Sequence, residues 1–566
     1  MVSIRKIGVI GRTYRHLNRY RQILTILFKY GFGDMIDRLK IDQYIEIGLQ
    51  MLSRTKRENV EKLSRAERFR LMLEELGPTF IKFGQILSTR PDIIPVDVLA
   101  EFEKLQDNVP PFSFPNVRRI IEYEFGRNIG EIFESIDEKP LASASIGQVH
   151  KAVLKDGDET VAVKIQRPSI RKTVEVDLEI MLHIATLMER NIEEAELHKP
   201  VNVIEEFART ISRELDYAIE ATNMERVAAD FIKDRTIYIP KVYNDYSGTR
   251  VLTMEYIDGI KVSELDKLEA AGLDRKTITS HGANFILKQV FEYGFFHADP
   301  HPGNIFILPN NVLCPIDFGM TGTVDNRSRD LFVDILENVA KRNPQKTARL
   351  LLELGEYDEE PDLRVFENEI DDFMGRHLFK NIKDIDVGKL LQDFLDIATR
   401  HRIRVPPGIF FMMKAFASVE GIARLLDPEF DMIGHAEPYV KKAKLARYSP
   451  KKLTGELFTT IADSITVFQD LPKEVLQTVR LARQNKLTLN VELKGLESFL
   501  KTHDQVSNRL AFAIIIGALI MGSALLLAFN TPPLIYGVSF VGIIGFSVAA
   551  VFGIWLLIAI LKRGMM

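Results

Sequence analysis

The sequence predicts an α+β protein in which a small sheet-bearing lobe precedes a larger helical lobe. Three observations lead to this prediction. Alternating, strand-like patterns are confined to the middle of the N-terminal half and to one short stretch after residue 300. Helical patterns fill most of the remaining chain, and two long uncharged apolar runs lie at its C-terminal end. At roughly 150 residues per domain, the 566 residues leave room for several domains.

Six segments are expected along the chain. They are a basic amphipathic N-terminal helical region, a helical extension, a sheet-bearing lobe with a helical insert, a helical lobe, a helical linker and a transmembrane helical hairpin: 1–50, 51–138, 139–262, 263–450, 451–508 and 509–563. The sheet prediction depends on two alternating stretches, Gln148–Leu154 and Thr160–Ile165, which Lys155-Asp-Gly-Asp joins as a hairpin turn.

The N-terminal region contains a basic amphipathic helix. Met1–Gly33 holds seven Lys or Arg residues and no Asp or Glu, while Tyr20, Leu24 and Leu27 share one helical face. An organelle transit peptide, a membrane-surface helix and an ordinary packing helix all fit this pattern. We favour the membrane-surface helix, because a second membrane contact fits a chain with a predicted C-terminal anchor.

The C-terminal segment contains two apolar runs, 510–529 and 534–561, each long enough to cross a hydrocarbon core of about 30 Å as a helix. Asn530 to Pro533 are the predicted turn. One cationic residue precedes the first run and two follow the second, so the positive-inside rule places both ends in the cytosol. We therefore expect a multi-pass protein of the plasma membrane whose catalytic body lies on the cytoplasmic side.

Small residues recur every four positions in both apolar runs. They are Ala518 and Gly522 in the first run and Gly545, Ala549 and Gly553 in the second. Such a stripe lets two helices approach closely, although the ordinary abundance of glycine in membrane helices explains it equally well.

The charge balance excludes some classes of function. The net charge is −4, which argues against a nucleic-acid partner. The single cysteine, Cys314, excludes an intrachain disulfide and any cysteine-based metal site. Ten acidic residues in 353–372 are expected to be solvated surface, and six basic residues in 441–452 fit either contact with anionic lipid or ordinary surface.

The strongest chemical signal is a motif around residue 300. Asp299 is followed five positions later by Asn304 and, after a predicted short hairpin, by Asp317-Phe-Gly. Kinase-type sites use this layout, in which the first Asp orients or deprotonates the acceptor, while Asn304 and Asp317 hold Mg²⁺ against the phosphates of ATP. The sequence therefore predicts a bilobal protein-kinase-like fold with ATP and Mg²⁺ as cofactors.

Two histidines in the same motif allow a different interpretation. His297 and His301 have the spacing of zinc ligands on a helix. Pro300 and Pro302 oppose a helix there, and the oxygen ligands already explain the motif. We therefore favour a structural role for both histidines.

A second part of the nucleotide site is expected in the sheet-bearing lobe. Lys164 ends an apolar strand, as the phosphate-binding lysine of kinases does. The segment Ala142–Val149 matches the glycine-rich loop pattern, except that Ala142 and Ala144 replace its first two glycines, which predicts a stiffer loop with altered transfer activity. The residues assigned to nucleotide binding in this lobe are Ala142, Ala144, Ser145, Ile146, Gly147, Val149, Ala162, Lys164 and Glu255.

Acidic partners for Lys164 are expected on one helix that bears Glu214 and Glu220. At 100° per residue they lie about 600° apart, so they point to different sides and have different roles.

The chain resembles the UbiB family of atypical protein-kinase-like proteins, which is associated with ubiquinone biosynthesis. The resemblance extends over roughly the whole chain, and its C-terminal membrane helices are similar to those of bacterial members. The motifs that carry it are Lys82-Phe-Gly-Gln85, the alanine-rich loop from Ala142, Glu214-Leu-Asp216, His297–Asn304 and Asp317-Phe-Gly.

The resemblance implies roles for particular residues. Lys164 is expected to pair with Glu220, and Asp299, Asn304 and Asp317 to serve the magnesium–nucleotide site. Lys82, Gln85 and Glu214 are expected to form a polar triad where a protein substrate would lie, which favours ATPase activity over protein phosphorylation. The expected partners are ATP and membrane lipids or polyprenyl-quinone intermediates. Quinone-biosynthesis enzymes and a second copy of the chain are further candidates, and the oligomeric state stays open.

Three functions remain open at this point. The first is a membrane-anchored, magnesium-dependent ATPase or atypical kinase that acts on or extracts polyprenyl lipids. The second is a phosphotransferase for a small molecule or lipid, and the third is a nucleotide-sensing pseudokinase scaffold. A direct monooxygenase is disfavoured, because the sequence has no dinucleotide fingerprint and no evident iron-ligand cluster.

Overall fold

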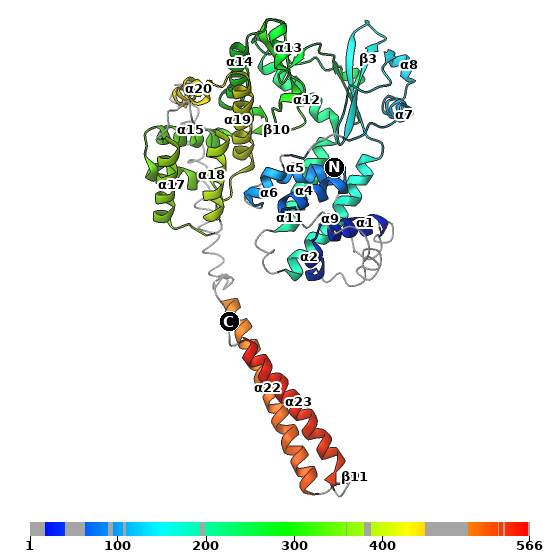
Figure 1. The fold of residues 1–566 in the computed structure, drawn as a ribbon, viewed down its shortest axis with the longest axis vertical. Coiled ribbons are helices and arrows are strands. Elements are labelled where there is room, and N and C mark those ends of the chain that lie inside the picture. Colours follow the sequence, from blue (N-terminus) through cyan, green and yellow to red (C-terminus); the bar gives the residue numbers. More distant parts are fainter. Residues whose placement is uncertain are drawn as a thin grey trace, which may run out of the picture. The chain divides into compact units, whose positions relative to one another are not determined.

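The computed structural model divides into two compact units, Met1–Thr454 and Gly455–Met566. It describes residues 17–39, 63–88, 94–102, 104–105, 109–192, 199–357, 359–378, 387–447, 496–529, 531–535 and 538–563. The first unit contains sheets and many helices, and the second contains mainly two long helices (Figure 1). The mixed helix and strand content confirms the expected α+β class. Most of the predicted linker 451–508 lies outside the described residues.

The N-terminal region and the helical extension contain several short helices. The N-terminal region contains α1 (Leu17–Lys29) and α2 (Gly33–Arg38), and the extension begins with α4 (Arg65–Leu76), α5 (Pro78–Leu87) and α6 (Val96–Phe102). Ser64 and Glu67 form a capping box that starts α4. Gly77, at φ +98°, then turns the chain, and Pro78 occupies the first position of α5, where its missing N–H costs nothing.

The apolar face of α1 packs inside the protein. Tyr20, Leu24 and Leu27 are all buried in the main hydrophobic cluster. Arg19 forms an ion pair with the fully buried Asp177 at 2.7 Å, and Lys29 pairs with a glutamate of α4. The preference for a membrane-surface helix was therefore wrong for residues 17–29, which form a packing helix. The first sixteen residues lie outside the described part of the chain.

The small lobe is built on an antiparallel sheet with the order β1-β3-β4-β5, and β2 pairs with β3. Its strands are β1 (Phe133–Ile136), β2 (Ala142–Ser143), β3 (Gly147–Leu154), β4 (Thr160–Gln166) and β5 (Val251–Glu255). The β3–β4 hairpin follows the predicted alternation. Helices α7 (Phe114–Phe125) and α8 (Ile129–Ile132) precede the sheet, and α9 (Ile170–Asn191), α11 (Pro200–Glu214) and α12 (Tyr217–Asp230) form the insert.

The large lobe is mostly helical, with two small antiparallel sheets that hold the motif around residue 300. Its strands and short helical turns are β6 (Ile260–Lys261), η3 (Gln289–Tyr293), β7 (Phe295–His297), η4 (Pro302–Asn304), β8 (Ile305–Leu308), β9 (Val312–Pro315) and β10 (Thr321–Thr323). The helices are α13 (Leu265–Ala270), α14 (Arg275–Lys288), α15 (Asn326–Ala340), α16 (Pro344–Leu354), α17 (Leu363–Leu378), α18 (Val387–Arg400), α19 (Pro407–Leu426) and α20 (Met432–Arg447).

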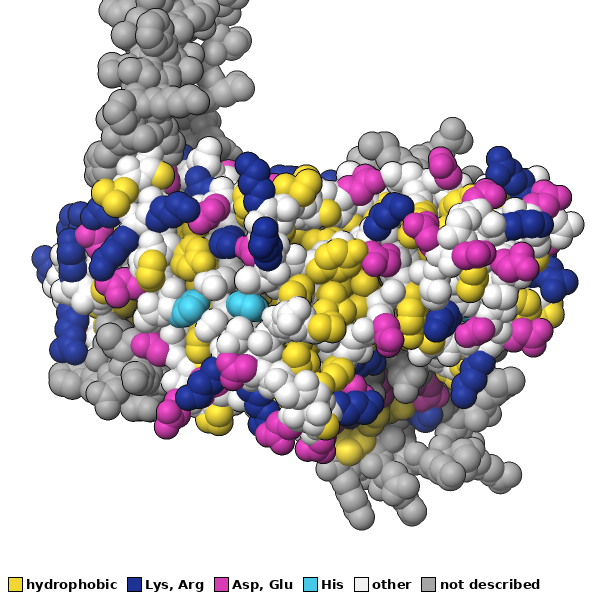
Figure 2. All heavy atoms as spheres, turned by 90° about the horizontal axis from the view of Figure 1, so that it is seen from above, with side chains coloured by type: hydrophobic (Ala, Val, Ile, Leu, Met, Phe, Trp, Pro, Cys, Tyr) yellow, Lys and Arg dark blue, Asp and Glu magenta, His cyan; other side chains and the backbone are white. Residues whose placement is uncertain are grey.

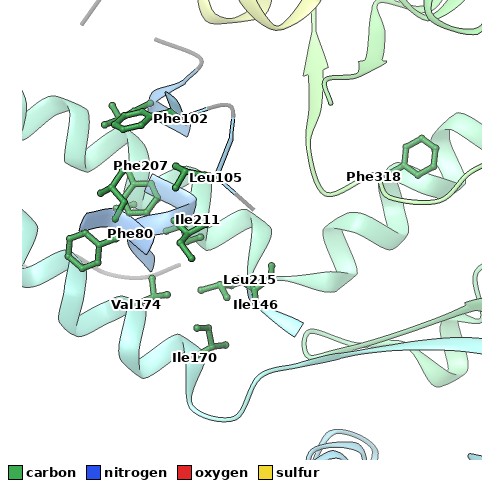
Figure 3. Close-up of a cluster of buried hydrophobic side chains, with 14 of the residues drawn as sticks. Phe80, Phe102, Leu105, Ile146, Ile170, Val174, Phe207, Ile211, Leu215 and Phe318 are labelled. Carbon is green, nitrogen blue, oxygen red and sulfur yellow. The ribbon is translucent and has the colours of Figure 1, made fainter. Parts of the chain in front are cut away.

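One hydrophobic cluster joins the extension to the small lobe. Figure 3 shows Phe80 and Leu105 of the extension beside Phe207 and Ile211 of α11. Ile146, from the loop between β2 and β3, belongs to the same cluster. Buried apolar area is the main stabilising contribution, so the extension is an integral part of the fold.

The basic run on α20 is largely neutralised within the protein. Lys442 pairs with Glu292 and Lys444 with Glu337, at 2.9 and 2.7 Å, and Arg447 pairs with an aspartate of α15. Basic and acidic side chains are interspersed over the face of the molecule that Figure 2 shows. The alternative of an ordinary surface therefore fits 441–447 better than contact with anionic lipid, and residues 448–452 lie outside the described part.

The second unit contains α22 (Leu496–Ala528) and α23 (Phe540–Arg563), which pack against each other. Among the described residues, one helical segment, Leu510–Ala528, is long and apolar enough to cross a membrane. The second apolar run differs from its prediction, because β11 (Leu534–Ile535) and β12 (Val538–Ser539) pair with each other and the helix begins at Phe540. The structure thus contains one candidate span, and the transmembrane hairpin is not confirmed.

Part of the small-residue stripe lies at the contact between these helices. A Cβ at Gly545 would overlap Ser523 of α22, and Ala549 is buried. Gly522 and Gly553, by contrast, have open space where a Cβ would be. The close approach therefore involves Gly545 and Ala549, the first two residues of the stripe in the second run.

Candidate functional site

The site is centred on Lys164, which lies between two acidic side chains. Its Nζ donates to both carboxylate oxygens of Glu220 at 2.8 Å. The same atom lies 3.8 Å from Oδ2 of Asp317. Lys164 and Glu220 are nearly buried, whereas the side chain of Asp317 is 41% exposed. A lysine in this position neutralises one carboxylate and leaves the other facing solvent.

The backbone fixes this arrangement from three elements. Lys164 lies in β4, where it is paired with Val149 of β3 and Leu252 of β5. Glu220 lies in the first turn of α12, which Asp216 caps by accepting a hydrogen bond from Ala218 N–H. Glu214 ends the preceding helix α11, so the prediction of one continuous helix bearing both glutamates was wrong. The helix is interrupted at Leu215, because Asp216 is the N-cap of the next helix.

Asp299 and Asn304 lie in the loop between β7 and β8. Strand β7 pairs with β10, and the N–H of Asp299 donates to Nδ1 of His297 at 3.1 Å. Across the β8–β9 hairpin, the carbonyl of Asn304 accepts from Ile316 N–H at 3.0 Å, directly before Asp317. The structure thereby brings Asn304 and Asp317 together, as their spacing predicts. The side chain of Asp299 is 42% exposed to solvent.

The charges around Asp317 keep it ionised. Desolvation opposes ionisation of the carboxyl group, but Lys164, the N–H of Gly319, His297 and Lys82 outweigh it and lower its pKa to about 2. The carboxylates of Asp317 and Glu220 in turn raise the pKa of Lys164 against the opposing effect of burial. At neutral pH the site therefore presents an ammonium group beside an accessible carboxylate.

The alanine-rich loop is tied down by Arg167. The guanidinium donates to the carbonyl of Ala144 at 3.0 and 3.1 Å and to the hydroxyl of Ser143 at 3.0 Å. It also reaches the carbonyl of Val109, on the extension side, at 3.2 Å. These bonds agree with the expected stiffness of the loop, and they add a restraint that the alanines do not supply.

Gly147 is the third glycine of the loop pattern, and close packing around it explains why this position has no side chain. A Cβ at this position would overlap the hydroxyl of Tyr217 and lie 2.7 Å from the carbonyl oxygen of Ile165. Ala142 and Ala144 lie nearer the surface, whereas Ser145 and Ile146 are buried. The pattern therefore departs from glycine only at the first two positions. Val149 follows in β3.

The motif from Lys82 to Gln85 lies in α5, against the insert. Nζ of Lys82 forms an ion pair with Glu214 at 2.5 Å, and both side chains are 11% exposed. Gln85 donates to the carbonyl of Leu105 at 3.3 Å. A Cβ on Gly84 would overlap Leu105, so this glycine allows α5 to pack closely. Because Lys82 also influences the pKa of Asp317, the extension contributes to the electrostatics of the site.

Ala162 and Glu255 lie on neighbouring strands. Ala162 is buried in β4 opposite Met254 of β5. The carboxylate of Glu255 accepts from the hydroxyl of Tyr238 at 2.6 Å and from Lys241 N–H at 3.2 Å. These bonds hold the end of β5, so any contact of Glu255 with a nucleotide would have to share its carboxylate with Tyr238.

The two histidines have separate structural surroundings. His297 ends β7 and is buried, and burial lowers its pKa. His301 caps η4 by accepting from Gly303 N–H at 3.1 Å. Among the described residues, no three His, Cys, Asp or Glu side chains are grouped so that they alone could hold a metal ion. A magnesium ion bound mainly through phosphates and water needs only one or two carboxylates, so Asn304 and Asp317 remain a suitable pair.

Sequence reasoning missed two basic residues of the site. Arg167 follows β4 directly, and only its position after the predicted strand could have drawn attention to it. Lys414 on α19 lies 3.5 Å from Oδ1 of Asp299, and no local pattern connects these distant positions.

The fold and this arrangement define a kinase-like protein, and comparisons with known proteins agree. Residues 104–351 match the model of the ABC1 atypical kinase-like domain, 370–431 the UbiB helical domain and 494–562 the ABC1/UbiB kinase-like C-terminal domain. The chain belongs to the UbiB family of atypical kinase-like proteins.

Curated relatives from bacteria are similar over most of their length. A "Probable protein kinase UbiB" of Cellvibrio japonicus is 36% identical over 73% of this chain and 76% of its own. A protein of the same name from Pseudomonas fluorescens is 38% identical over 70% and 75%. An uncharacterized protein encoded in the 5′ region of hydrogenase 1 of Clostridium pasteurianum is 31% identical over 96% and 99%.

Proposed function

We propose that the protein is a membrane-anchored, magnesium-dependent ATP-binding atypical kinase or ATPase that supports ubiquinone biosynthesis. The observation that carries this proposal is the position of Lys164 between Glu220 and Asp317, with Asn304 adjacent to Asp317. In this proposal Lys164 contacts the nucleotide phosphates, and Asp317 and Asn304 hold Mg²⁺, which supplies charge neutralisation at the phosphates.

The chain's own residues would divide the chemical tasks. The ionised Asp317 and the amide of Asn304 offer oxygen ligands of the kind that Mg²⁺ prefers. The partly exposed Asp299 would orient an acceptor or a water molecule and accept its proton. The loop from Ala142 to Val149 would cover the phosphates, restrained by Arg167.

The location and substrate class are proposed on other grounds. Leu510–Ala528 is apolar and almost entirely exposed within the second unit, as a lipid-facing helix would be. Together with the charge distribution at the ends of the apolar runs, this supports anchoring in the inner membrane with the catalytic body in the cytoplasm. The family name supports polyprenyl-quinone intermediates as the lipids that the protein acts on or extracts.

The proposal is tested with the full chain purified into lipid nanodiscs. Phosphate release from ATP is measured with and without Mg²⁺ for the wild type, for Asp317→Asn and for Asp372→Asn, which changes an exposed carboxylate on α17. We expect hydrolysis that requires Mg²⁺ in the wild type and the control and is lost in Asp317→Asn. Equal activity in all three proteins, or none in the wild type, would refute the proposal.

A comparison of lipids in cells tests the pathway. Cells that carry Asp317→Asn should accumulate a prenylated quinone precursor that cells with the wild type do not. If quinone and precursor levels are unchanged, the role in quinone synthesis is wrong even where hydrolysis is confirmed.

A phosphotransferase acting on a small molecule or lipid is the second candidate. The 42% exposure of Asp299 favours it, because the carboxylate can be reached by an acceptor hydroxyl. Incubation with labelled ATP and membrane lipid extract distinguishes the two, since this candidate predicts a phosphorylated product and the first predicts free phosphate. A scaffold that only senses nucleotide predicts full cellular function for Asp299→Asn.

A further inference from the structure

Asp299 has a cationic neighbour that comes from a distant part of the chain. Nζ of Lys414, on α19, lies 3.5 Å from Oδ1 of Asp299. The catalytic-loop segment 297–304 contains no Lys or Arg of its own. The positive charge beside Asp299 is therefore supplied by α19.

The core of the large lobe fixes this relationship. Three residues of α19 that flank Lys414, namely Ile409, Met412 and Ala415, are buried in the same cluster as Phe296 of β7 and Ala298. The start of α19 is also held closely, because a Cβ on Gly408 would lie 2.5 Å from the carbonyl oxygen of Thr323 in β10. Strand β10 pairs with β7, which leads directly to Asp299. The backbones at Lys414 and Asp299 thus belong to one packed body.

Stability alone gives little reason for a lysine at this position. Its side chain is 24% exposed and that of Asp299 is 42% exposed, and ion pairs between such exposed groups contribute little to folding. The stem of Lys414 is nevertheless partly covered, so its ammonium group is directed toward the site and is not free to sample the surface.

Lys164 and Lys414 are arranged in a comparable way. Lys164 lies 3.8 Å from Asp317, and Lys414 lies 3.5 Å from Asp299. A nucleotide triphosphate would bring several negative charges toward both carboxylates. Each carboxylate thus has one lysine whose ammonium group can also contact a phosphate, because Lys offers three donors from a compact charge.

We propose that Lys414 binds the terminal phosphate of the nucleotide and holds it beside Asp299. The proposal rests on the ATP-binding function proposed above and adds a residue that discriminates ATP from ADP. Without the Lys414 charge, the terminal phosphate would face the Asp299 carboxylate with one neutralising group fewer.

The test is a measurement of nucleotide affinity with the full chain in nanodiscs and excess Mg²⁺. Isothermal titration calorimetry compares a non-hydrolysable ATP analogue with ADP for the wild type, Lys414→Gln, Lys414→Arg and Lys414→Glu. Lys442→Gln is the matched control, because it removes the same charge from an exposed ion pair on α20. Thermal unfolding of each variant shows whether its fold is retained.

We expect Lys414→Gln to weaken binding of the ATP analogue by about tenfold or more, as loss of a charged hydrogen bond does, and to change ADP affinity less than about twofold. Lys414→Arg should retain most of the preference for the ATP analogue over ADP. Lys414→Glu should lose more affinity for the ATP analogue than Lys414→Gln does. Lys442→Gln should bind both nucleotides as the wild type does. These four results together support the proposal.

Other outcomes overturn it. An equal loss of ATP and ADP affinity in Lys414→Gln, no loss of either, or a selective loss in Lys442→Gln would each contradict a specific contact with the terminal phosphate. If the wild type binds both nucleotides and Lys414→Gln is unchanged, only this proposal fails. If the wild type binds neither nucleotide, the proposed function fails with it.

Discussion

Lys164 and Glu220 form a nearly buried ion pair in which the lysine Nζ lies 2.8 Å from both carboxylate oxygens. The pair joins the sheet of the small lobe to the first turn of α12. It therefore determines both where the ammonium group lies and how the insert is attached, and it gives the first prediction.

Glu220→Gln should damage the site and destabilise the fold together. Breaking a buried ion pair costs about 3–5 kcal/mol when the remaining charge has no other partner. Because Asp317 lies 3.8 Å from Lys164, the cost here should be at or below the lower end of that range. We expect a lower thermal unfolding midpoint and weaker nucleotide binding. Glu225→Gln, on an exposed part of the same helix, is the control and should change neither. An unchanged unfolding midpoint in Glu220→Gln would show that the ion pair does not stabilise the fold.

Asp317→Asn should remove the magnesium dependence of nucleotide binding without unfolding the protein. The amide oxygen of asparagine can still accept the hydrogen bond from Gly319 N–H, which lies 2.9 Å from Oδ1, so the local turn is preserved. Calorimetric titrations of ATP with and without Mg²⁺ measure the effect. Full magnesium dependence in the variant would mean that Asp317 is not a metal ligand.

Ala144→Gly should loosen the loop over the phosphates and raise phosphoryl transfer. Glycine restores backbone freedom, although the two bonds from Arg167 to the carbonyl at this position remain possible. Autophosphorylation with labelled ATP and nucleotide affinity are the measurements. Arg167→Lys loses the forked contact with the carbonyl of Ala144, so it should also loosen the loop and raise phosphoryl transfer. If neither variant changes transfer or affinity, loop stiffness does not limit the reaction.

Gly84→Ala should destabilise the extension by about 1–3 kcal/mol, because the added methyl group overlaps Leu105 and lies 2.7 Å from a methyl carbon of Leu73. Gly421→Ala in α19 is a matched control with open space around the new Cβ, and it should instead stabilise by up to about 1 kcal/mol through helix propensity. Thermal unfolding midpoints of the two variants should therefore move in opposite directions.

The Glu337 carboxylate predicts a pH dependence of stability. Hydrogen bonds from Lys341 and Lys444 lower its pKa to about 2. An unfolded glutamate titrates near pH 4.3, so this contribution is complete above that value and is lost as the pH falls toward 2. Glu337→Gln should lower the unfolding midpoint at pH 7, by an amount equivalent to about 1 kcal/mol or less, and the difference should vanish near pH 2. A difference that is independent of pH would contradict this.

The sequence was most informative where function depends on short spacings. Asp299, Asn304 and Asp317 are joined by one hairpin, so their order along the chain already determines that they lie together. Lys164 was found because a strand pattern ends at it. The break between Glu214 and Glu220 was missed, although Asp216 is a good helix cap, because an acidic residue within a helical pattern is also common.

Relationships that depend on tertiary packing could not be predicted. An amphipathic basic helix has the same pattern whether its apolar face meets lipid or protein. The pattern therefore does not show that the apolar face of α1 packs inside the protein. The contact of Lys414 with Asp299 joins residues far apart in the chain, and only the packing of α19 on β10 creates it. Apolar composition fits a strand as well as a helix, so the sequence predicts a helix from Leu534, whereas α23 begins at Phe540.

The bonds of Arg167 have a kinetic consequence. Because this side chain joins the loop carbonyl of Ala144 to that of Val109, the loop that we propose to cover the nucleotide cannot move away without breaking its link to Val109. We therefore expect nucleotide release to be slow and to follow a larger opening motion between the lobes. The residence time of a bound nucleotide would then be set by the rate at which these hydrogen bonds break.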